Sequence, residues 1–263
     1  MVSCSGVSAM LTVDLAGKKA LVTGASTGIG RAIAVALARN GADVAVNYCS
    51  SRAAAEEAGR EIRALGRRCP VIQADVASRA EVARLFAEVE AAFGPKLDIL
   101  INNAGGLISR ELIAVMREET FDRVVAVNFK SVFLCSQAAM PRLADGTGRV
   151  INISSVAARN GGGPGASVYA ASKAAVSCFT KNLAKELAPR GITANGIAPG
   201  VLATPFHEKY STPELMQRFA ANTPLGHNGV AEDCVGAALF LVSPEASFVT
   251  GEMIEVNGGM LMD

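Results

Sequence analysis

Tryptophan is absent from this 263-residue chain, and only 5% of its residues are aromatic. No apolar run is long enough to cross a bilayer, and the first ten residues lack the basic segment and apolar stretch of a signal peptide. The 25 Lys and Arg nearly balance the 24 Asp and Glu, and no basic cluster is present. We therefore expect a soluble, cytoplasmic protein with a small-molecule substrate and no nucleic-acid or membrane partner.

Disulfide and metal-binding patterns are also missing. The six cysteines, at positions 4, 49, 69, 135, 178 and 234, lie far apart, with no C-x-x-C pair and no histidine at metal-ligand spacing. This spacing predicts free thiols and no metal site.

What the chain does contain is an alternation of aliphatic strands and helices. Half of its residues are apolar, as suits a parallel sheet buried between helices. Seven strands are predicted at Lys19–Val22, Asp43–Asn47, Pro70–Ala74, Leu97–Ile101, Arg149–Ile153, Thr193–Ile197 and Met253–Val256. Helical stretches are predicted near 28–39, 53–65, 79–93, 118–143, 168–188 and 231–242.

This alternation predicts an α/β fold with right-handed crossovers. We expect a single-domain Rossmann fold over residues 15–263, with a seven-stranded doubly wound parallel sheet and helices on both faces. Residues 1–14 are expected to form a loose N-terminal extension, with Met10 as an alternative start. The glycine-rich segment 161–165 is expected to be a loop.

A glycine-rich turn follows the first predicted strand. Residues 23–30 read TGASTGIG, with glycines at Gly24, Gly28 and Gly30. Such glycines let the backbone approach a pyrophosphate, and the amides that open the next helix can bind its charge. The spacing differs from the G-x-G-x-x-G dinucleotide fingerprint, so a tight turn without a ligand remains an alternative.

Tyr169 and Lys173 lie four residues apart in a stretch that reads as helix, so their side chains share one face. A phenol with a pKa of about 10 needs a nearby positive charge to act as an acid or base at neutral pH. Lys173 can provide that charge. The structural alternative is a half-buried ring beside a solvated amine.

Six motifs in this order resemble those of the short-chain dehydrogenase/reductase family, from about Leu15 to the C-terminus. They are the TGASTGIG loop, Asn102-Asn103-Ala104-Gly105, Asn128, Ile151-Asn152-Ile153-Ser154-Ser155, Tyr169 with Lys173, and Pro199-Gly200. Within the family, the chain resembles 3-oxoacyl-acyl carrier protein reductase-like and glucose dehydrogenase-like members. The resemblance implies an NAD(P)-dependent alcohol dehydrogenase or ketone reductase.

The resemblance also implies the catalytic roles. Tyr169 would be the acid/base, Lys173 would lower its pKa and hold the cofactor ribose, and Asn128 would hold a water of the proton relay. A buried amide at a helix kink is compatible with that role of Asn128. Adjacent strand residues face opposite ways, so only one of Ser154 and Ser155 can point at the substrate. Relatives use the second serine, which is Ser155, 14 residues before Tyr169, and Ser154 is the lesser candidate.

Ligands of such sheets bind beyond the carboxyl ends of the strands. The resemblance implies that Asp75 and Val76 contact the adenine and that Thr204 touches the nicotinamide carboxamide. An ordinary role at a helix N-terminus is equally open for Asp75. The full set of expected cofactor contacts is Gly24, Ser26, Thr27, Gly28, Ile29, Gly30, Asn47, Tyr48, Ser50, Ser51, Arg52, Asp75, Val76, Asn103, Ala104, Gly105, Tyr169, Lys173, Pro199, Gly200, Val201 and Thr204.

The end of the second strand predicts which nicotinamide cofactor binds. A carboxylate there would hold the ribose 2′-hydroxyl of NAD and repel the 2′-phosphate of NADP. Residues 47–52 read NYCSSR and contain no carboxylate, whereas Asp43 opens the strand at the wrong edge of the sheet. These donors and the charge of Arg52 favour NADP(H) over NAD(H). Arg52 could instead serve only the next helix, and Thr27 stands where many NADP-preferring relatives have a basic residue.

The stretch from Thr204 to Gly226 occupies the variable substrate lid of the family. His207 meets either a polar substrate or solvent, and the apolar lid residues either line a pocket or pack on the body of the protein. We expect a secondary alcohol or ketone of sugar, polyol or 3-oxoacyl type. A non-catalytic cofactor-binding regulator or scaffold is the alternative. The family also implies a homotetramer that assembles through the helices at 118–143 and 168–188.

Overall fold

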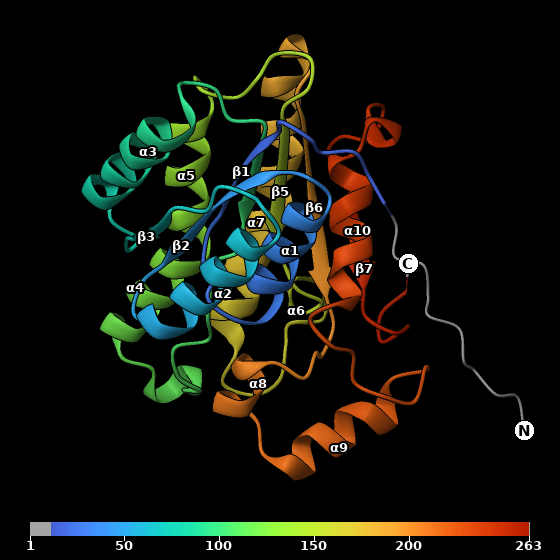
Figure 1. Cartoon of the computed structure of the whole chain (residues 1–263). Helices are drawn as coiled ribbons and strands as arrows, with labels where there is room; N and C mark the ends of the chain where they lie inside the picture. The colour runs from blue at the N-terminus through green and yellow to red at the C-terminus, as the bar shows by residue number, and fades with distance from the viewer. Residues whose placement is uncertain (1–11, 263) are drawn as a thin grey trace, which may run out of the picture.

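The structure is a computed structural model that describes residues 12–262, and it contains a seven-stranded sheet in which every neighbouring pair of strands is parallel (Figure 1). The strand order is β3-β2-β1-β4-β5-β6-β7, so the direction of crossover reverses between β1 and β4. The predicted doubly wound fold is confirmed. The strands are β1 (Lys19–Val22), β2 (Asp43–Tyr48), β3 (Val71–Gln73), β4 (Ile99–Asn102), β5 (Arg149–Ile153), β6 (Thr193–Pro199) and β7 (Met253–Val256).

Helices cover both faces of the sheet, and each face has its own apolar cluster (Figure 1). One face is covered by α1 (Gly28–Arg39), α2 (Arg52–Ala64) and α10 (Asp233–Val242). The other is covered by α3 (Arg79–Phe93), α4 (Glu118–Val125), α5 (Ser131–Ala139) and α7 (Ser167–Leu187). The short helices α6 (Ala157–Asn160), α8 (Pro205–Tyr210) and α9 (Pro213–Asn222) follow the carboxyl ends of β5 and β6.

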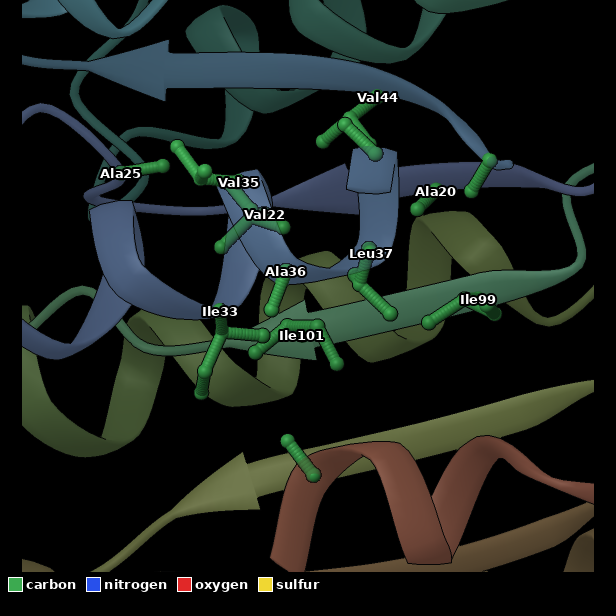
Figure 2. Packing of buried hydrophobic residues seen from close by; sticks show 14 of the residues in the cluster. Ala20, Val22, Ala25, Ile33, Val35, Ala36, Leu37, Val44, Ile99 and Ile101 are labelled. Carbon is green, nitrogen blue, oxygen red and sulfur yellow. The ribbon is translucent and has the colours of Figure 1, made fainter. Parts of the chain in front are cut away.

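Helix α1 packs on β1 and β4 through aliphatic side chains (Figure 2). Ile33 and Leu37 of the helix and Val22 and Ile101 of the strands are at most 1% exposed. Burying each side chain of this kind contributes about 1.5–3 kcal/mol. The glycine-rich turn directly precedes α1, so this packing fixes the turn at the carboxyl end of β1.

The stretch 118–143, which the sequence predicts as one helix, is interrupted. A π-helical turn at Ala126–Lys130 separates α4 from α5. Inside this turn, Asn128 Nδ2 donates to Val124 O at 2.8 Å and to Gly106 O at 2.8 Å, and Asn128 Oδ1 accepts from Gly106 N at 3.0 Å. The wider turn therefore lets one buried amide bond both its own helix and the loop that follows β4.

Outside the main strands and helices, some predictions from the sequence agree with the structure and others miss short helices. Helices α6, α8 and α9 are not predicted, whereas the segment 161–165 is irregular, as expected. Of the predicted extension at 1–14, only residues 12–14 are among those described, and Met10 lies outside them. No helix within residues 12–262 is both long and apolar enough to cross a membrane.

Candidate active site

A cavity of about 710 Å³ lies at the carboxyl edge of the sheet and gathers most of the residues predicted from the sequence. The predicted residues that line it are Gly24, Ser26, Thr27, Gly28, Ile29, Asn47, Ser50, Ser51, Asp75, Val76, Asn103, Ala104, Gly105, Ser155, Tyr169, Lys173, Pro199, Gly200, Val201 and Thr204. Gly30, Tyr48, Arg52 and Asn128 are not part of its lining. Because segments far apart in the sequence converge on this cavity, we take it as the candidate site.

The glycine-rich turn is held in place by the loop after β4. Asn103 Nδ2 donates to the carbonyl oxygens of Thr23 and Gly24, both at 2.9 Å, and Thr23 Oγ1 accepts from the backbone N–H groups of Asn103 and Ala104. Gly24 has a φ of 61°, and a Cβ there would lie 2.9 Å from Ala104 Cα. A Cβ at Gly30 would lie 2.4 Å from Asn103 Nδ2, so this glycine serves packing.

The first turn of α1 opens toward the cavity. Gly28, with a φ of 55°, and Ile29 begin the helix and line the cavity, and the first N–H groups of a helix have no partner within it. Thr27, at the N-cap, makes no capping bond through its side chain. This turn therefore presents free donors and the positive end of a helix dipole, which suits a pyrophosphate.

At the end of β2, some side chains bond or pack within the protein, and others face the cavity. Asn47 is 1% exposed, and its amide bonds Gly24 N and the carbonyl oxygens of Tyr48, Ile72 and Ala74. Its polar atoms are thus already used within the protein. Tyr48 packs in the core, and Arg52 is the exposed first residue of α2. Of the predicted donors of residues 47–52, Ser50 and Ser51 remain at the cavity wall.

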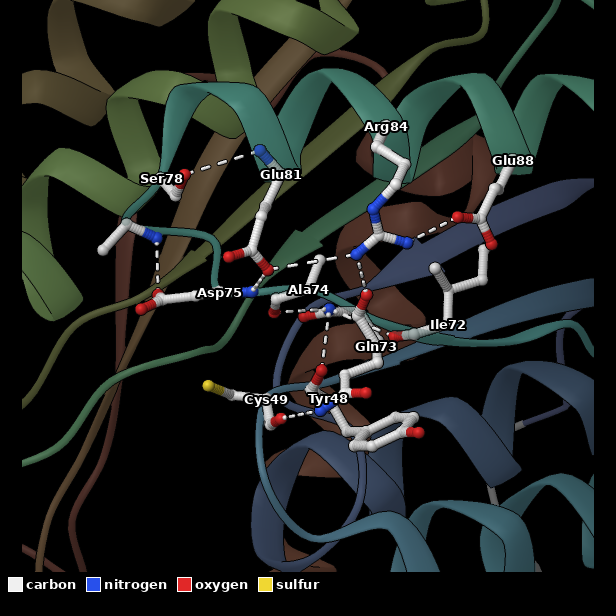
Figure 3. A network of polar contacts seen from close by, with 12 residues as sticks. Tyr48, Cys49, Ile72, Gln73, Ala74, Asp75, Ser78, Glu81, Arg84 and Glu88 are labelled. Atoms are coloured by element: carbon white, nitrogen blue, oxygen red, sulfur yellow. Dashed lines mark hydrogen bonds and ion pairs between the residues drawn. The ribbon is translucent and has the colours of Figure 1, made fainter.

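Asp75 borders the cavity and is bonded on several sides (Figure 3). Its side chain accepts from Ala77 N at 2.9 Å and pairs with Arg123 Nη1 at 3.0 Å, while its backbone N–H donates to Glu81 at 2.7 Å. Burial would raise the pKa of Asp75, but these bonds outweigh it and lower the pKa. The carboxylate therefore fixes the turn before α3 and remains charged beside the cavity.

Tyr169, Ser155 and Lys173 come together at the inner end of the cavity. Burial raises the pKa of the half-buried Tyr169, and a side-chain hydrogen bond with Ser155 opposes that rise. Lys173 Nζ lies 5.9 Å from the centroid of the Tyr169 ring and donates to Ile153 O at 2.8 Å. Burial lowers the pKa of Lys173 to about 8. The arrangement places a phenol, a hydrogen-bond partner and a cation within one small region, but Lys173 does not lower the pKa of Tyr169 as the sequence predicts.

Two neighbouring serines have different surroundings. The hydroxyl of Ser154 donates to Lys173 O at 3.0 Å and bonds Ser177 Oγ at 2.7 Å, so it is tied to α7. Ser155 Oγ accepts from Ala157 N at 3.1 Å and bonds Tyr169. This difference favours Ser155 as the serine that faces a substrate.

Asn128 does not line the cavity, but it lies directly behind Gly105, which does. Asn128 is fully buried, and its amide is bonded to Gly106 and Val124. A Cβ built at Gly105 would lie 2.7 Å from Asn128 Oδ1 and 3.1 Å from Lys173 Nζ. Only a glycine at position 105 lets the loop pass this close to both side chains.

Helix α8 packs against Tyr169 through its aromatic side chains. The Phe206 ring is 5.8 Å from the Tyr169 ring and 5.1 Å from both the Tyr210 ring and the His207 ring. Burial, with a contribution from Arg110, lowers the pKa of His207 to about 4, and His207 Nδ1 bonds Ser211 Oγ at 2.9 Å. His207 is therefore a neutral part of an aromatic cluster that also lines the cavity.

Sequence reasoning misses several cavity residues, among them Cys49, Arg110 and Arg123. Cys49 lies between the predicted donors at the end of β2, and Arg123 is one turn before the π-helical turn, so their positions were available from the sequence. Arg110 lies in an irregular loop that no motif marks. Among the described residues, no group of three or more His, Cys, Asp or Glu side chains is placed to hold a metal ion.

Comparisons with known proteins agree with this geometry. A family model described as enoyl-(acyl carrier protein) reductase matches residues 24–261. The chain is 45% identical over 247 residues to the 3-oxoacyl-[acyl-carrier-protein] reductase FabG of Staphylococcus aureus, covering 93% of this chain and 98% of that protein. It is 44% identical over 258 residues to an NADPH-dependent aldehyde reductase-like protein, chloroplastic, of Arabidopsis thaliana, covering 94% and 95%.

A solved structure of a related protein has the same fold. A short-chain dehydrogenase from Burkholderia cenocepacia in complex with NADP matches with a TM-score of 0.88 at 38% identity, covering 94% of this chain and 99% of that one. A doubly wound sheet with a glycine-rich turn at β1 and a Tyr–Lys pair in the cavity defines a nucleotide-binding oxidoreductase. The chain belongs to the short-chain dehydrogenase/reductase family. The cofactors named for two of these proteins agree with the NADP(H) preference predicted from the sequence.

Proposed function

We propose that this enzyme reduces a carbonyl substrate with NADPH and that Tyr169 is the acid that protonates the carbonyl oxygen. The observation that carries this proposal is the meeting of Tyr169, Ser155 and Lys173 at the inner end of the cavity that the glycine-rich turn opens. A regulator or scaffold that only binds a cofactor would have no use for a phenol, a hydroxyl and an amine gathered in one cavity.

The lining of the cavity supports the binding of a dinucleotide. The glycine-rich turn and the first turn of α1 would hold the pyrophosphate, Asp75 and Val76 would border the adenine, and Thr204 would meet the nicotinamide. When bound, NADP(H) supplies or accepts the hydride. Ser50 and Ser51, with no carboxylate among residues 47–52, support NADP(H) over NAD(H).

The chain's own groups handle the proton. Because burial raises the pKa of Tyr169, its phenol is protonated at neutral pH and ready to act as an acid in the reductive direction. Ser155 would donate a hydrogen bond to the same carbonyl oxygen and stabilise its developing negative charge. The Lys173 ammonium would stabilise the tyrosinate that remains, and Asn128 would hold the loop and a water beyond Lys173.

For the substrate, a 3-oxoacyl thioester is our first proposal. The name of the bacterial relative supports it, and the plant relative's name supports aldehydes as a second candidate. The apolar rings of α8 above Tyr169 suit the carbon chain of either class. Phe206 and Phe219 make part of that wall apolar, whereas Arg110, His207 and Tyr210 are polar residues of the same cavity, so a sugar is a third candidate.

The test is a turnover assay with purified enzyme, NADPH and NADH, and a panel of 3-oxoacyl thioesters, aldehydes, diketones and aldoses. We expect oxidation of NADPH with 3-oxoacyl thioesters and a clear preference for NADPH over NADH. Binding of NADPH without turnover on any carbonyl would support the non-catalytic regulator or scaffold instead.

We also propose a homotetramer formed through the α4–α5 and α7 helices.

A further inference from the structure

Arg110 joins three segments at the mouth of the cavity. It belongs to the loop after β4, and its Nε donates to Tyr210 O, at the end of α8, at 2.9 Å. Its Nη1 donates to Pro164 O, in the segment before α7, at 3.2 Å. The backbones are also close, because a Cβ at Gly165 would lie 3.1 Å from Glu111 N and 3.3 Å from the backbone of Arg110. One guanidinium therefore bridges the lid and the loop that leads to Tyr169.

This bridge is the main polar attachment of α8. Within residues 12–262, the hydrogen bonds of α8 otherwise stay between positions 204 and 211, and the bond from Arg110 is the one that reaches the body of the protein. The remaining attachment is aromatic, through Phe206 against Tyr169 and His207 against Phe219 of α9. Apolar rings can slide on one another, whereas a guanidinium bonded to two carbonyl groups fixes direction as well as distance.

The loop that carries Arg110 is itself held rigid. Asn128 bonds both backbone groups of Gly106, and the Glu111 carboxylate accepts from Ser109 Oγ at 2.8 Å and from Thr120 Oγ1 at 3.0 Å. Between these anchors, Ile108 has a φ of 65°, the one positive φ at a non-glycine residue in the described part of the chain. A branched residue keeps such a backbone only where its surroundings enforce it.

We propose that Arg110 is a positioning residue that fastens the substrate lid over Tyr169. By holding the end of α8 against the segment before α7, it keeps the Phe206 ring on the Tyr169 ring and sets the width of the substrate entrance. Its effect is on the binding of the carbonyl substrate, and it does not alter how the adenosine part of the cofactor binds. The expected effect on catalysis rests on the proposed function, whereas the effect on the lid does not.

The experiment compares Arg110→Met and Arg110→Lys with the unchanged enzyme. Arg218→Met is the matched control, because Arg218 is exposed on α9 and its side chain makes no hydrogen bond or ion pair with any residue that the structure describes. The first readout is the rate of tryptic cleavage after Lys209, an exposed residue of α8, followed by mass spectrometry of the intact protein. The second is steady-state kinetics with NADPH and the best carbonyl of the panel, together with the Kd of NADPH.

In Arg110→Met we expect faster cleavage after Lys209 and a fall of about tenfold or more in kcat/KM, mostly through a higher KM for the carbonyl, because a charged hydrogen bond is lost. The Kd of NADPH and the Tm should change little. Arg110→Lys should recover part of the loss, since an amine can reach one of the two carbonyl groups, and Arg218→Met should match the unchanged enzyme.

Unchanged cleavage after Lys209 in Arg110→Met would overturn the proposal, as would faster cleavage with an unchanged KM. An equal loss in Arg218→Met would also overturn it, because the effect would then follow from charge alone. If the unchanged enzyme reduces no carbonyl, the proposed function fails, but the cleavage rates still decide whether Arg110 holds the lid.

Discussion

Lys173 is a buried lysine whose charge is expected to affect the stability of the protein. It is 3% exposed, and its ammonium group lies in the interior beside Tyr169 with a bond to Ile153 O. Burial lowers its pKa to about 8, compared with about 10.4 for a lysine in an unfolded chain. The protein thus keeps a cation at a place where water would stabilise it better, and the role that we propose for Lys173 accounts for this cost.

This burial predicts a dependence of stability on pH. Below about pH 8 the folded protein carries the full cost of the buried charge. Between about pH 8 and 10.4 the unfolded chain binds more protons at Lys173 than the folded one, so stability increases with pH. In Lys173→Met this increase should vanish, which changes the difference in unfolding free energy between the two proteins by roughly 2 kcal/mol from about pH 7 to 10.

Urea unfolding of both proteins without cofactor at the two pH values measures that difference. Other titrating groups are shared by the two proteins and cancel in the comparison. Parallel pH curves for Lys173→Met and the unchanged protein would show that Lys173 is not a buried cation.

Ser51 provides a test of the cofactor preference. It is the N-cap residue of α2 and lines the cavity, and aspartate is as good an N-cap as serine. Ser51→Asp should therefore fold normally but repel the 2′-phosphate, weakening NADPH by about tenfold or more while affecting NADH much less. Ser51→Asn has nearly the same shape without the charge and should keep the preference. Equal losses of NADPH affinity in the two variants would mean that the phosphate is held elsewhere.

At the scale of elements, the loop after β4 connects the glycine-rich turn, the π-helical turn and α7. Asn103 holds the glycine-rich turn, Gly106 is held by Asn128, and Gly105 passes between Asn128 and Lys173. A change in this loop is therefore expected to reach several parts of the site at once.

A comparison of Gly105→Ala with Gly106→Ala tests this arrangement. A Cβ at position 105 would overlap Asn128 Oδ1 at 2.7 Å, whereas a Cβ at Gly106 would have nothing within 4 Å. We expect Gly105→Ala to lower kcat at least tenfold more than Gly106→Ala does, because it displaces Asn128 and Lys173. Steady-state kinetics of both variants, with circular dichroism to confirm folding, gives the comparison. Similar activity in the two variants would contradict this account of the loop.

The sequence predicts the elements of this fold well because its signals are local. Period and composition mark the strands and long helices, and the glycine-rich turn and the spacing of Tyr169 and Lys173 mark the site. The features that the sequence does not reveal are those that depend on where side chains point. Nothing in the sequence shows that Tyr48 turns into the core, that Asn47 uses its amide within the protein, or that Arg110 reaches two distant carbonyl groups. The π-helical turn likewise goes together with a tertiary bond, from Asn128 to Gly106.

At the scale of the whole molecule, an apolar groove of about 600 Å³ lies between α4 and α7 on the outer surface. Ile113, Phe121 and Phe129 are among the residues that line it, and Ile113 and Phe121 are 77% and 47% exposed. Exposed apolar surface of this kind is typical of surfaces where protein chains associate. It lies on the helices through which we propose that the homotetramer forms.

Light scattering should accordingly give a mass of about four times the chain mass of 27.1 kDa. Phe121→Asp should shift the protein to smaller species, because it places a charge on the apolar face. Leu65→Asp is the control, since Leu65 is a similarly exposed apolar residue, 40% accessible, at the end of α2. A monomer mass for the unchanged protein, or an equal shift in both variants, would remove the proposal.

The measurement that tests the central claim most directly is the comparison of Tyr169→Phe with the unchanged enzyme in NADPH binding and in NADPH oxidation by a 3-oxoacyl thioester. The change removes one oxygen atom from the inner end of the cavity and leaves the ring against Phe206. We predict a fall in kcat of about a hundredfold or more, the usual contribution of a general acid, with the Kd of NADPH changed less than about threefold. Full activity in Tyr169→Phe would contradict the claim that Tyr169 protonates the substrate.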